Sequence, residues 1–135
     1  MSDIVSATRS YLLTQSGVTA LVGQRIYWDN LPQSATLPAL VIELSSSDLA
    51  DRTLAIVGTL FLSYVNVYCY ASTHAAAASI GDAAHAALEF QSGTWGSVAV
   101  KRCYVENTQD VTDSPRDGSD AFRRVRALFC SMWHN

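Results

Sequence analysis

The run from Thr59 to Ala71 constrains the fold most, because its side chains alternate strictly enough to predict one long β-strand. One predicted face is small and apolar, and we expect it to enter the core: Phe61, Val65, Val67, Cys69 and Ala71. The other face is rich in aromatic side chains: Leu60, Leu62, Tyr64, Asn66, Tyr68 and Tyr70. Three tyrosines on a face can keep their hydroxyl groups in water while their rings are covered. That face is therefore either a second core layer under a helix or loop, or a surface between subunits.

An alanine-rich segment follows this strand directly and predicts a helix that Ser72-Thr73 caps and that ends near Phe90. A first helix is expected after a cap at Ser2, with one further turn before Gly23. The remaining strands are expected over four segments: residues 24–28, 39–44, 97–105 and 121–133. The chain is thus predicted to be one α+β domain, residues 1–135, with an antiparallel sheet of about four strands packed against two main helices.

The charge of the chain argues against a protein that grips nucleic acid. It has 9 Lys+Arg against 12 Asp+Glu, a formal net charge of −3 and a single lysine, Lys101. Phosphate binding needs clustered cations, and Arg123, Arg124 and Arg126 alternate between the faces of a strand. Only 16% of the residues are charged, against the usual ~25%, which leaves surface for contact with partners.

Neither a secretory signal nor a membrane-spanning run is recognisable: the start MSDIVSATRS lacks the basic and apolar regions of a signal peptide. Three cysteines, Cys69, Cys103 and Cys130, lie far apart, without a CxxC pair. This spacing suits reduced, buried thiols and predicts neither a metal site nor a cofactor.

The best candidates for catalysis are Asp82 and His85, which are i, i+3 neighbours on the alanine-rich helix. His74 lies too far along that helix to share a ligand with His85. Six aspartates are expected in loops without the calcium-binding frame: Asp48, Asp51, Asp110, Asp113, Asp117 and Asp120. Phosphate loops and zinc-protease motifs are missing as well, so the chain is not expected to be an enzyme. A small hydrolase using Asp82 and His85 remains the alternative.

Three stretches carry a resemblance. They are VTALVGQRIYWDNLPQSATLPALVIEL (residues 18–44), VNVYCYASTHAAAASIGDAAHAALE (residues 65–89) and RRVRALFCSMW (residues 123–133). In order and spacing they resemble the tail completion, or tail terminator, proteins of long-tailed bacteriophages, also described as head-to-tail joining proteins. The resemblance covers nearly the whole chain. A connector-stopper or a tail-tube relative is the nearest alternative.

The resemblance implies a virion structural protein of the tail or neck, made in the cytoplasm of the host bacterium. Such subunits assemble into a ring, usually hexameric, that caps the tail-tube protein and docks to the head-side connector. DNA passes through the channel without being read, which an acidic lumen suits.

Two sets of residues are expected to serve this assembly. The aromatic strand face and the lip after Arg25-Ile26-Tyr27 are predicted to form subunit contacts: Tyr64, Tyr68, Tyr70, Trp28, Asp29 and Asn30. Flexible assembly loops are expected to carry the charged residues Asp48, Asp51, Arg52, Asp113, Arg116 and Asp117.

Overall fold

The computed structural model describes residues 3–32, 35–49, 60–113 and 123–135. Its helices are α1 (Ile4–Leu12), α2 (Ser16–Val22) and α3 (His74–Leu88). Its strands are β1 (Ile26–Trp28), β2 (Ala39–Leu49), β3 (Phe61–Ala71), β4 (Gly93–Trp95), β5 (Val98–Asp113) and β6 (Arg123–His134). The strands form one sheet in the order β1-β2-β3-β6-β5-β4. Strands β1 and β2 are parallel, and all other pairs are antiparallel.

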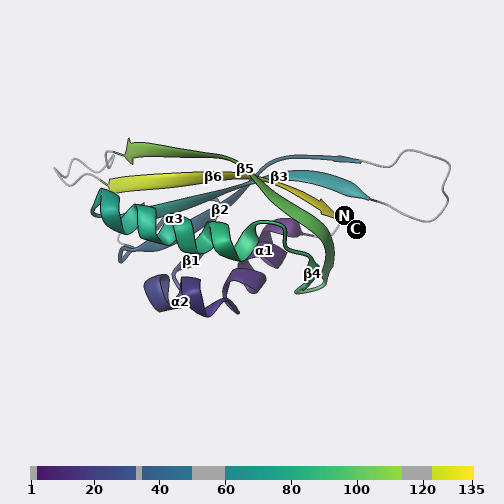
Figure 1. Ribbon diagram of the computed structural model, residues 1–135, viewed down its shortest axis with the longest axis horizontal. Helices are drawn as coiled ribbons and strands as arrows, with labels where there is room; N and C mark the ends of the chain where they lie inside the picture. The colour runs from purple at the N-terminus through teal and green to yellow at the C-terminus, as the bar shows by residue number, and fades with distance from the viewer. Residues whose placement is uncertain (1–2, 33–34, 50–59, 114–122) are drawn as a thin grey trace.

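This architecture corrects the expected fold class. An antiparallel sheet of about four strands against two main helices was wrong, because the described chain has six strands of mixed direction and three short helices. The polar segments SSSDL and ENTQDVTD read as loops, yet they extend β2 and β5 by pairing with β3 and β6. Strand β1 lies within the segment 24–28 that was expected to be a strand, whereas β4 has only 3 residues, too few for an alternation to be seen. The result is a curled, mostly β fold (Figure 1).

Local sequence explains where the helices begin and end. The Asp3 carboxylate caps α1 by accepting hydrogen bonds from the backbone N–H groups of Val5 (3.1 Å) and Ser6 (3.2 Å). The expected cap, Ser2, lies outside the described residues. The hydroxyl of Thr73 accepts from Ala76 N at 3.2 Å and begins α3, as predicted. Gly23, with φ 61°, ends α2, a conformation that a residue with a Cβ rarely adopts.

All three helices pack on one face of the sheet (Figure 1). The core lies between them and the sheet, and its fully buried members include Ile4, Leu12, Val18, Leu40, Ile42, Val65, Val67, Ile80, Leu88, Leu128 and Met132. Burial of one such side chain contributes about 1.5–3 kcal/mol. The ring of Tyr11 on α1 stacks on Trp95 of β4 with 4.1 Å between centroids, and its hydroxyl donates to the Ala87 carbonyl of α3. This residue thereby joins α1, α3 and β4.

The opposite face of the sheet carries no described helix or strand. We call it the open face. Among the residues that the structure describes, no helix or strand covers the tyrosine side of β3.

Candidate assembly surface

Alternation along the central strands gathers aromatic side chains on the open face. From β3 come Tyr64, which is 39% exposed, and the half-buried Tyr68 and Tyr70. The neighbouring strands add Phe129, Trp133 and Tyr104, the last of them 37% exposed. Aromatic rings of this size dominate the energetics of protein interfaces. The open face therefore has the composition of a contact surface.

A hydrogen-bonded carboxylate lies on β2, at the border of this face. Glu43 Oε1 accepts from Asn66 Nδ2 and from the Tyr68 hydroxyl, each at 3.3 Å. Asn66 Nδ2 also lies 3.2 Å from the Tyr68 hydroxyl. Burial is the largest cause that raises the pKa of Tyr68, so its phenol stays protonated and remains a donor. The network fixes these side chains in place before any partner arrives.

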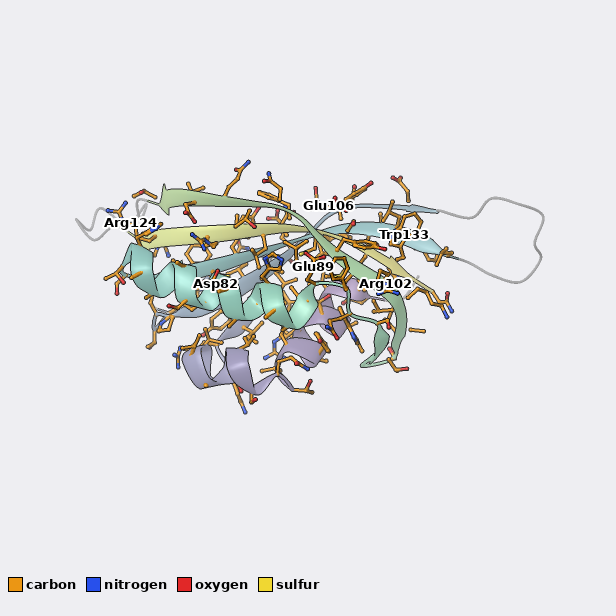
Figure 2. The ribbon with its side chains drawn as sticks, viewed as in Figure 1. Asp82, Glu89, Arg102, Glu106, Arg124 and Trp133 are labelled. Carbon is orange, nitrogen blue, oxygen red and sulfur yellow. The ribbon has the colours of Figure 1, made fainter. Side chains whose placement is uncertain are left out.

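A depression of about 370 Å³ adjoins this network and extends from Ser45 and Ser46 on β2 across the sheet to Glu106 on β5. Tyr64 and Phe129 form apolar walls, while Ser45 and Ser46 leave room because their side chains are small. Glu106 borders it and accepts a hydrogen bond from Ser131 Oγ at 2.7 Å. Figure 2 shows Glu106 on the side of the sheet away from α3.

The predicted lip residues lie elsewhere. Trp28, which is 47% exposed, follows Ile26 on the helix side of β1, and the Arg9 guanidinium stacks over its ring at 4.6 Å. Asp29 has φ 61° and donates its backbone N–H to Ile42 O at 2.9 Å, which turns the chain away from the sheet. A depression of about 440 Å³ between β2 and α1 is lined by Trp28, Asp29 and Leu44. The structure thus brings the three tyrosines together but separates them from Trp28, Asp29 and Asn30.

The residues expected in flexible loops divide into two groups. Asp48 lies within β2 and Asp113 ends β5, so their assignment to loops was wrong. Asp110, also expected in a loop, lies within β5 and forms an ion pair with Arg126 on β6 at 2.7 Å. Four further residues lie outside the described residues: Asp51, Arg52, Arg116 and Asp117.

The candidate catalytic pair is engaged in other contacts. His85 Nε2 lies 2.9 Å from Glu89 Oε2, and Asp82 Oδ1 lies 3.5 Å from Arg126 Nη1. Figure 2 shows Asp82 and Glu89 at α3, on the helix side of the sheet. Asp82 and His85 therefore each contact a residue other than the second member of the supposed dyad.

The thiol groups lie inside the fold. Cys69, Cys103 and Cys130 are free and buried. Burial raises the pKa of Cys69, and a hydrogen bond with Cys130 together with burial raises the pKa of Cys103. Because the thiolate is the nucleophile and metal ligand, neither group is activated. Over the described ranges, no three His, Cys, Asp or Glu side chains come together as a metal-binding group. Likewise, none of the helices placed in the structure is both long and apolar enough to cross a membrane.

Sequence reasoning missed the share of β5 and β6 in the open face. Phe129 and Trp133 were visible as the odd positions of RRVRALFCSMW, where odd and even residues point to opposite faces. Tyr104 lies within the expected strand 97–105, but Glu106 and the 49% exposed Val111 of β5 were not predictable, because the register shift between Val105 and Asn107 changes which residues share a face.

Comparison with known proteins now decides the family. The model of the family described as tail completion protein gp17 matches residues 6–129. The chain belongs to this family. It is a structural protein of the virion, located in the tail or neck, as the sequence predicted.

Solved structures show the same fold at low sequence identity. A chain from the virion of a native gene transfer agent particle is 18% identical, with a TM-score of 0.67 over 98% of this chain and 95% of that chain. A second solved chain is 15% identical, with a TM-score of 0.52 over 98% of this chain and 96% of the other. None of the curated proteins matches this chain.

Proposed function

We propose that this tail completion protein forms a ring, most simply a homohexamer, that caps the tail tube and joins it to the head-side connector. The proposal rests on the open face. In a monomer, Tyr64 and Tyr104 on this face are more than a third exposed, beside the hydrogen bonds of Glu43 with Asn66 and Tyr68. A surface of that kind is costly to leave in water and is typical of a site for other subunits.

Contacts within the particle are proposed for the tyrosines Tyr64, Tyr68 and Tyr70, and for Trp28, Asp29 and Asn30 on the helix side. The partners are further copies of this chain, the tail-tube protein and the head-side connector. DNA passes through the ring without specific binding, in keeping with a net charge of −3. The protein acts without catalysis, since Asp82 and His85 each have another partner.

Deletion of the gene tests this function against its nearest alternatives. A tail terminator is expected to leave over-long tails, or tails that fail to join heads, in negatively stained lysates. Normal-length tails on normally joined heads would count against termination. Loss of tails with DNA leaking from the heads would instead support a connector-stopper. Cryo-electron microscopy of the particle neck then gives the position and the number of copies together.

A further inference from the structure

The outer edge of β5 lacks a strand partner over half its length. Strand β4 pairs only with Val98–Val100, and residues Phe90 and Gln91 then exchange backbone hydrogen bonds with Cys103. The Glu89 carboxylate accepts a hydrogen bond from the Val105 N–H at 3.2 Å. From Glu106 to Asp113, β6 is the only described strand beside β5. Within this stretch the Thr108 N–H donates locally to Asn107 Oδ1 at 2.9 Å. A strand edge with a described strand on one side alone is a template for another strand.

Among the described strands, the outer edge of β2 likewise has a strand partner over only part of its length. Strand β1 pairs with Leu40–Ile42 alone, and the chain then turns away at Asp29. From Glu43 to Asp48, β3 is the one described strand beside β2. Figure 1 shows β5 and β2 ending at opposite ends of the long axis of the molecule.

We propose that residues 106–113 of β5 pair antiparallel with residues 43–48 of β2 in a second copy of this chain, so that the ring is closed by one continuous sheet. This inference rests on the proposed ring and names how its subunits join. The two surfaces are different parts of one chain, so the contact is head-to-tail, the kind that generates rings.

The strand directions fit such a seam. The block β2-β3-β6-β5 is antiparallel throughout, so β5 runs opposite to the β2 of a neighbour in the same orientation. Leu40 donates its N–H outward to the carbonyl of Arg25, just before β1, and the Cys103 N–H of β5 points outward to Gln91. Both residues belong to the helix-side core. On both edges, the residues whose backbone N–H and C=O groups point away from the sheet thus have their side chains on the helix side. Pairing of the two edges therefore places the helix side of one copy next to the helix side of the other.

The stagger of the two free edges also fits a closed ring. Through the register of the sheet, Thr108 lies level with Leu128, Val67 and Ile42. The centre of the free β5 edge is offset from the centre of the free β2 edge by about five residues, or ~17 Å along the strands. One subunit spans four strand spacings, about 19 Å. These two lengths imply strands tilted by about 40°, within the ~35–45° that closed barrels require.

Exposed side chains at the two edges are complementary in shape. With this stagger, Val111 of one copy lies beside Ser45 and Ser46 of the next, at the depression that Tyr64 walls. Val111 is 49% exposed and Tyr64 39% exposed. On the helix side, the exposed Leu44 flanks the same edge. The seam therefore covers apolar surface on both faces of the sheet.

Charge opposes the seam in dilute solution. Glu43 and Asp48 lie on one edge, and Glu106, Asp110 and Asp113 lie on the other. Arg126 neutralises Asp110 by a two-point contact of 2.7 and 3.0 Å, which leaves a net acidic pair of edges. Like charges on edge strands keep free subunits apart. Ring formation is therefore expected to increase with salt, since salt screens this repulsion.

Disulfide crosslinking tests the seam directly. In the full-length chain, Val111→Cys combined with Ser46→Cys is expected to give, after mild oxidation with oxidised glutathione, a ladder of covalent multimers that ends at the ring number. Each single variant is the control and is expected to remain monomeric on a non-reducing gel. Val111→Cys combined with Glu43→Cys or with Asp48→Cys tests pairings in which the strand register is shifted by one pair in either direction. Rings seen by electron microscopy that crosslink with none of the three partners would overturn the seam.

A proline scan gives an independent readout. Thr108→Pro removes an N–H of β5 that donates to Asn107 Oδ1 at 2.9 Å within the subunit and that a neighbouring strand would recruit in the seam. It leaves the bonds of β5 to β6 intact, as proline on an edge strand allows. Rings in native mass spectrometry are expected to fall at least tenfold, whereas the control Thr108→Val assembles as the wild type does. Rings of Thr108→Pro at the wild-type level contradict the seam and leave the proposed function standing. A wild-type chain that forms rings neither alone nor in particles removes the proposed function itself. Should Thr108→Pro fail to fold by circular dichroism, the crosslinks decide.

Discussion

Gly81 on α3 lies so close to Arg126 on β6 that a methyl group there would overlap it: a Cβ would lie 2.3 Å from Arg126 Cδ and 2.8 Å from Cγ. Arg126 is fixed in position, because its Nε and Nη2 donate hydrogen bonds to the two carboxylate oxygens of Asp110. Hydrogen bonding to Arg126 is also the first cause that lowers the pKa of Asp110. The glycine is thus required by the packing of helix against sheet, although it weakens the helix itself.

Gly81→Ala is expected to lower the free energy of unfolding by about 1 kcal/mol. Overpacking costs ~1–3 kcal/mol, and the better helix propensity of alanine offsets about 1 kcal/mol of this. Urea unfolding measures the difference. In an Arg126→Ala background the obstacle is gone, so the same change is expected to stabilise by about 1 kcal/mol. An equal loss in both backgrounds would mean that Arg126 is not what limits position 81.

A buried pair at the other end of the sheet gives the second prediction. His134 Nε2 lies 2.7 Å from Ser63 Oγ, and neither residue is exposed. Ser63→Ala leaves a buried ring nitrogen without its partner and is expected to cost about 1–3 kcal/mol in urea unfolding. Ser63→Ala with His134→Phe removes both polar groups and should cost less than the two single changes together. Strict additivity would show that the pair does not interact.

How far the fold was predictable depends on the range of the interactions. The alternation of β3 predicted that Val65, Val67 and Cys69 enter the core and that Tyr64 stays outside, because period-two burial is local. The helix start at Thr73 and the stop at Gly23 were also predictable, since a cap and a positive φ each depend on one residue. Local sequence thus predicted the core side of β3, the start of α3 and the end of α2.

The rest of the sheet depends on pairing between distant segments. Nothing in SSSDL or ENTQDVTD indicates a strand until β3 and β6 supply their partners. The parallel pairing of β1 with β2 is equally non-local. For the same reason Asp82 and His85 looked like a pair in the sequence, whereas Arg126 lies 44 residues away from Asp82 in the chain and became its partner.

The cap of α1 gives a stability difference that depends on pH. The hydrogen bond from the Ser6 hydroxyl is the largest cause that lowers the pKa of Asp3 from its ordinary value of 3.8. Burial, the second largest cause, opposes it, and the backbone N–H groups of Ser6 and Val5 lower the pKa further. A lowered pKa in the folded state means stability that is present above pH 3.8 and lost as the pH falls through the folded value. Asp3→Ala is expected to cost about 1 kcal/mol at neutral pH, and the gap to the wild type should narrow below about pH 4.

Thr73→Ala is the matched control for this experiment. The Thr73 hydroxyl caps α3 by accepting from Ala76 N at 3.2 Å and does not ionise. Its loss should cost a similar ~1 kcal/mol at every pH. Unfolding in urea between pH 3 and pH 7 separates the two variants. A pH-independent gap for Asp3→Ala would show that its charge adds nothing to the cap.

The open face supplies the last prediction, which concerns assembly. Tyr64→Asp is expected to abolish rings while the subunit stays folded, because a carboxylate covered by a neighbour without a partner costs several kcal/mol. Leu21→Asp on α2 is a matched control, since Leu21 is 40% exposed and Tyr64 39%. Tyr68→Asp is a less clean probe, because Tyr68 donates to Glu43 within the subunit. Native mass spectrometry reports the rings and circular dichroism the fold. If Tyr64→Asp and Leu21→Asp assemble equally well, the tyrosine side of the sheet lies outside the contact between subunits.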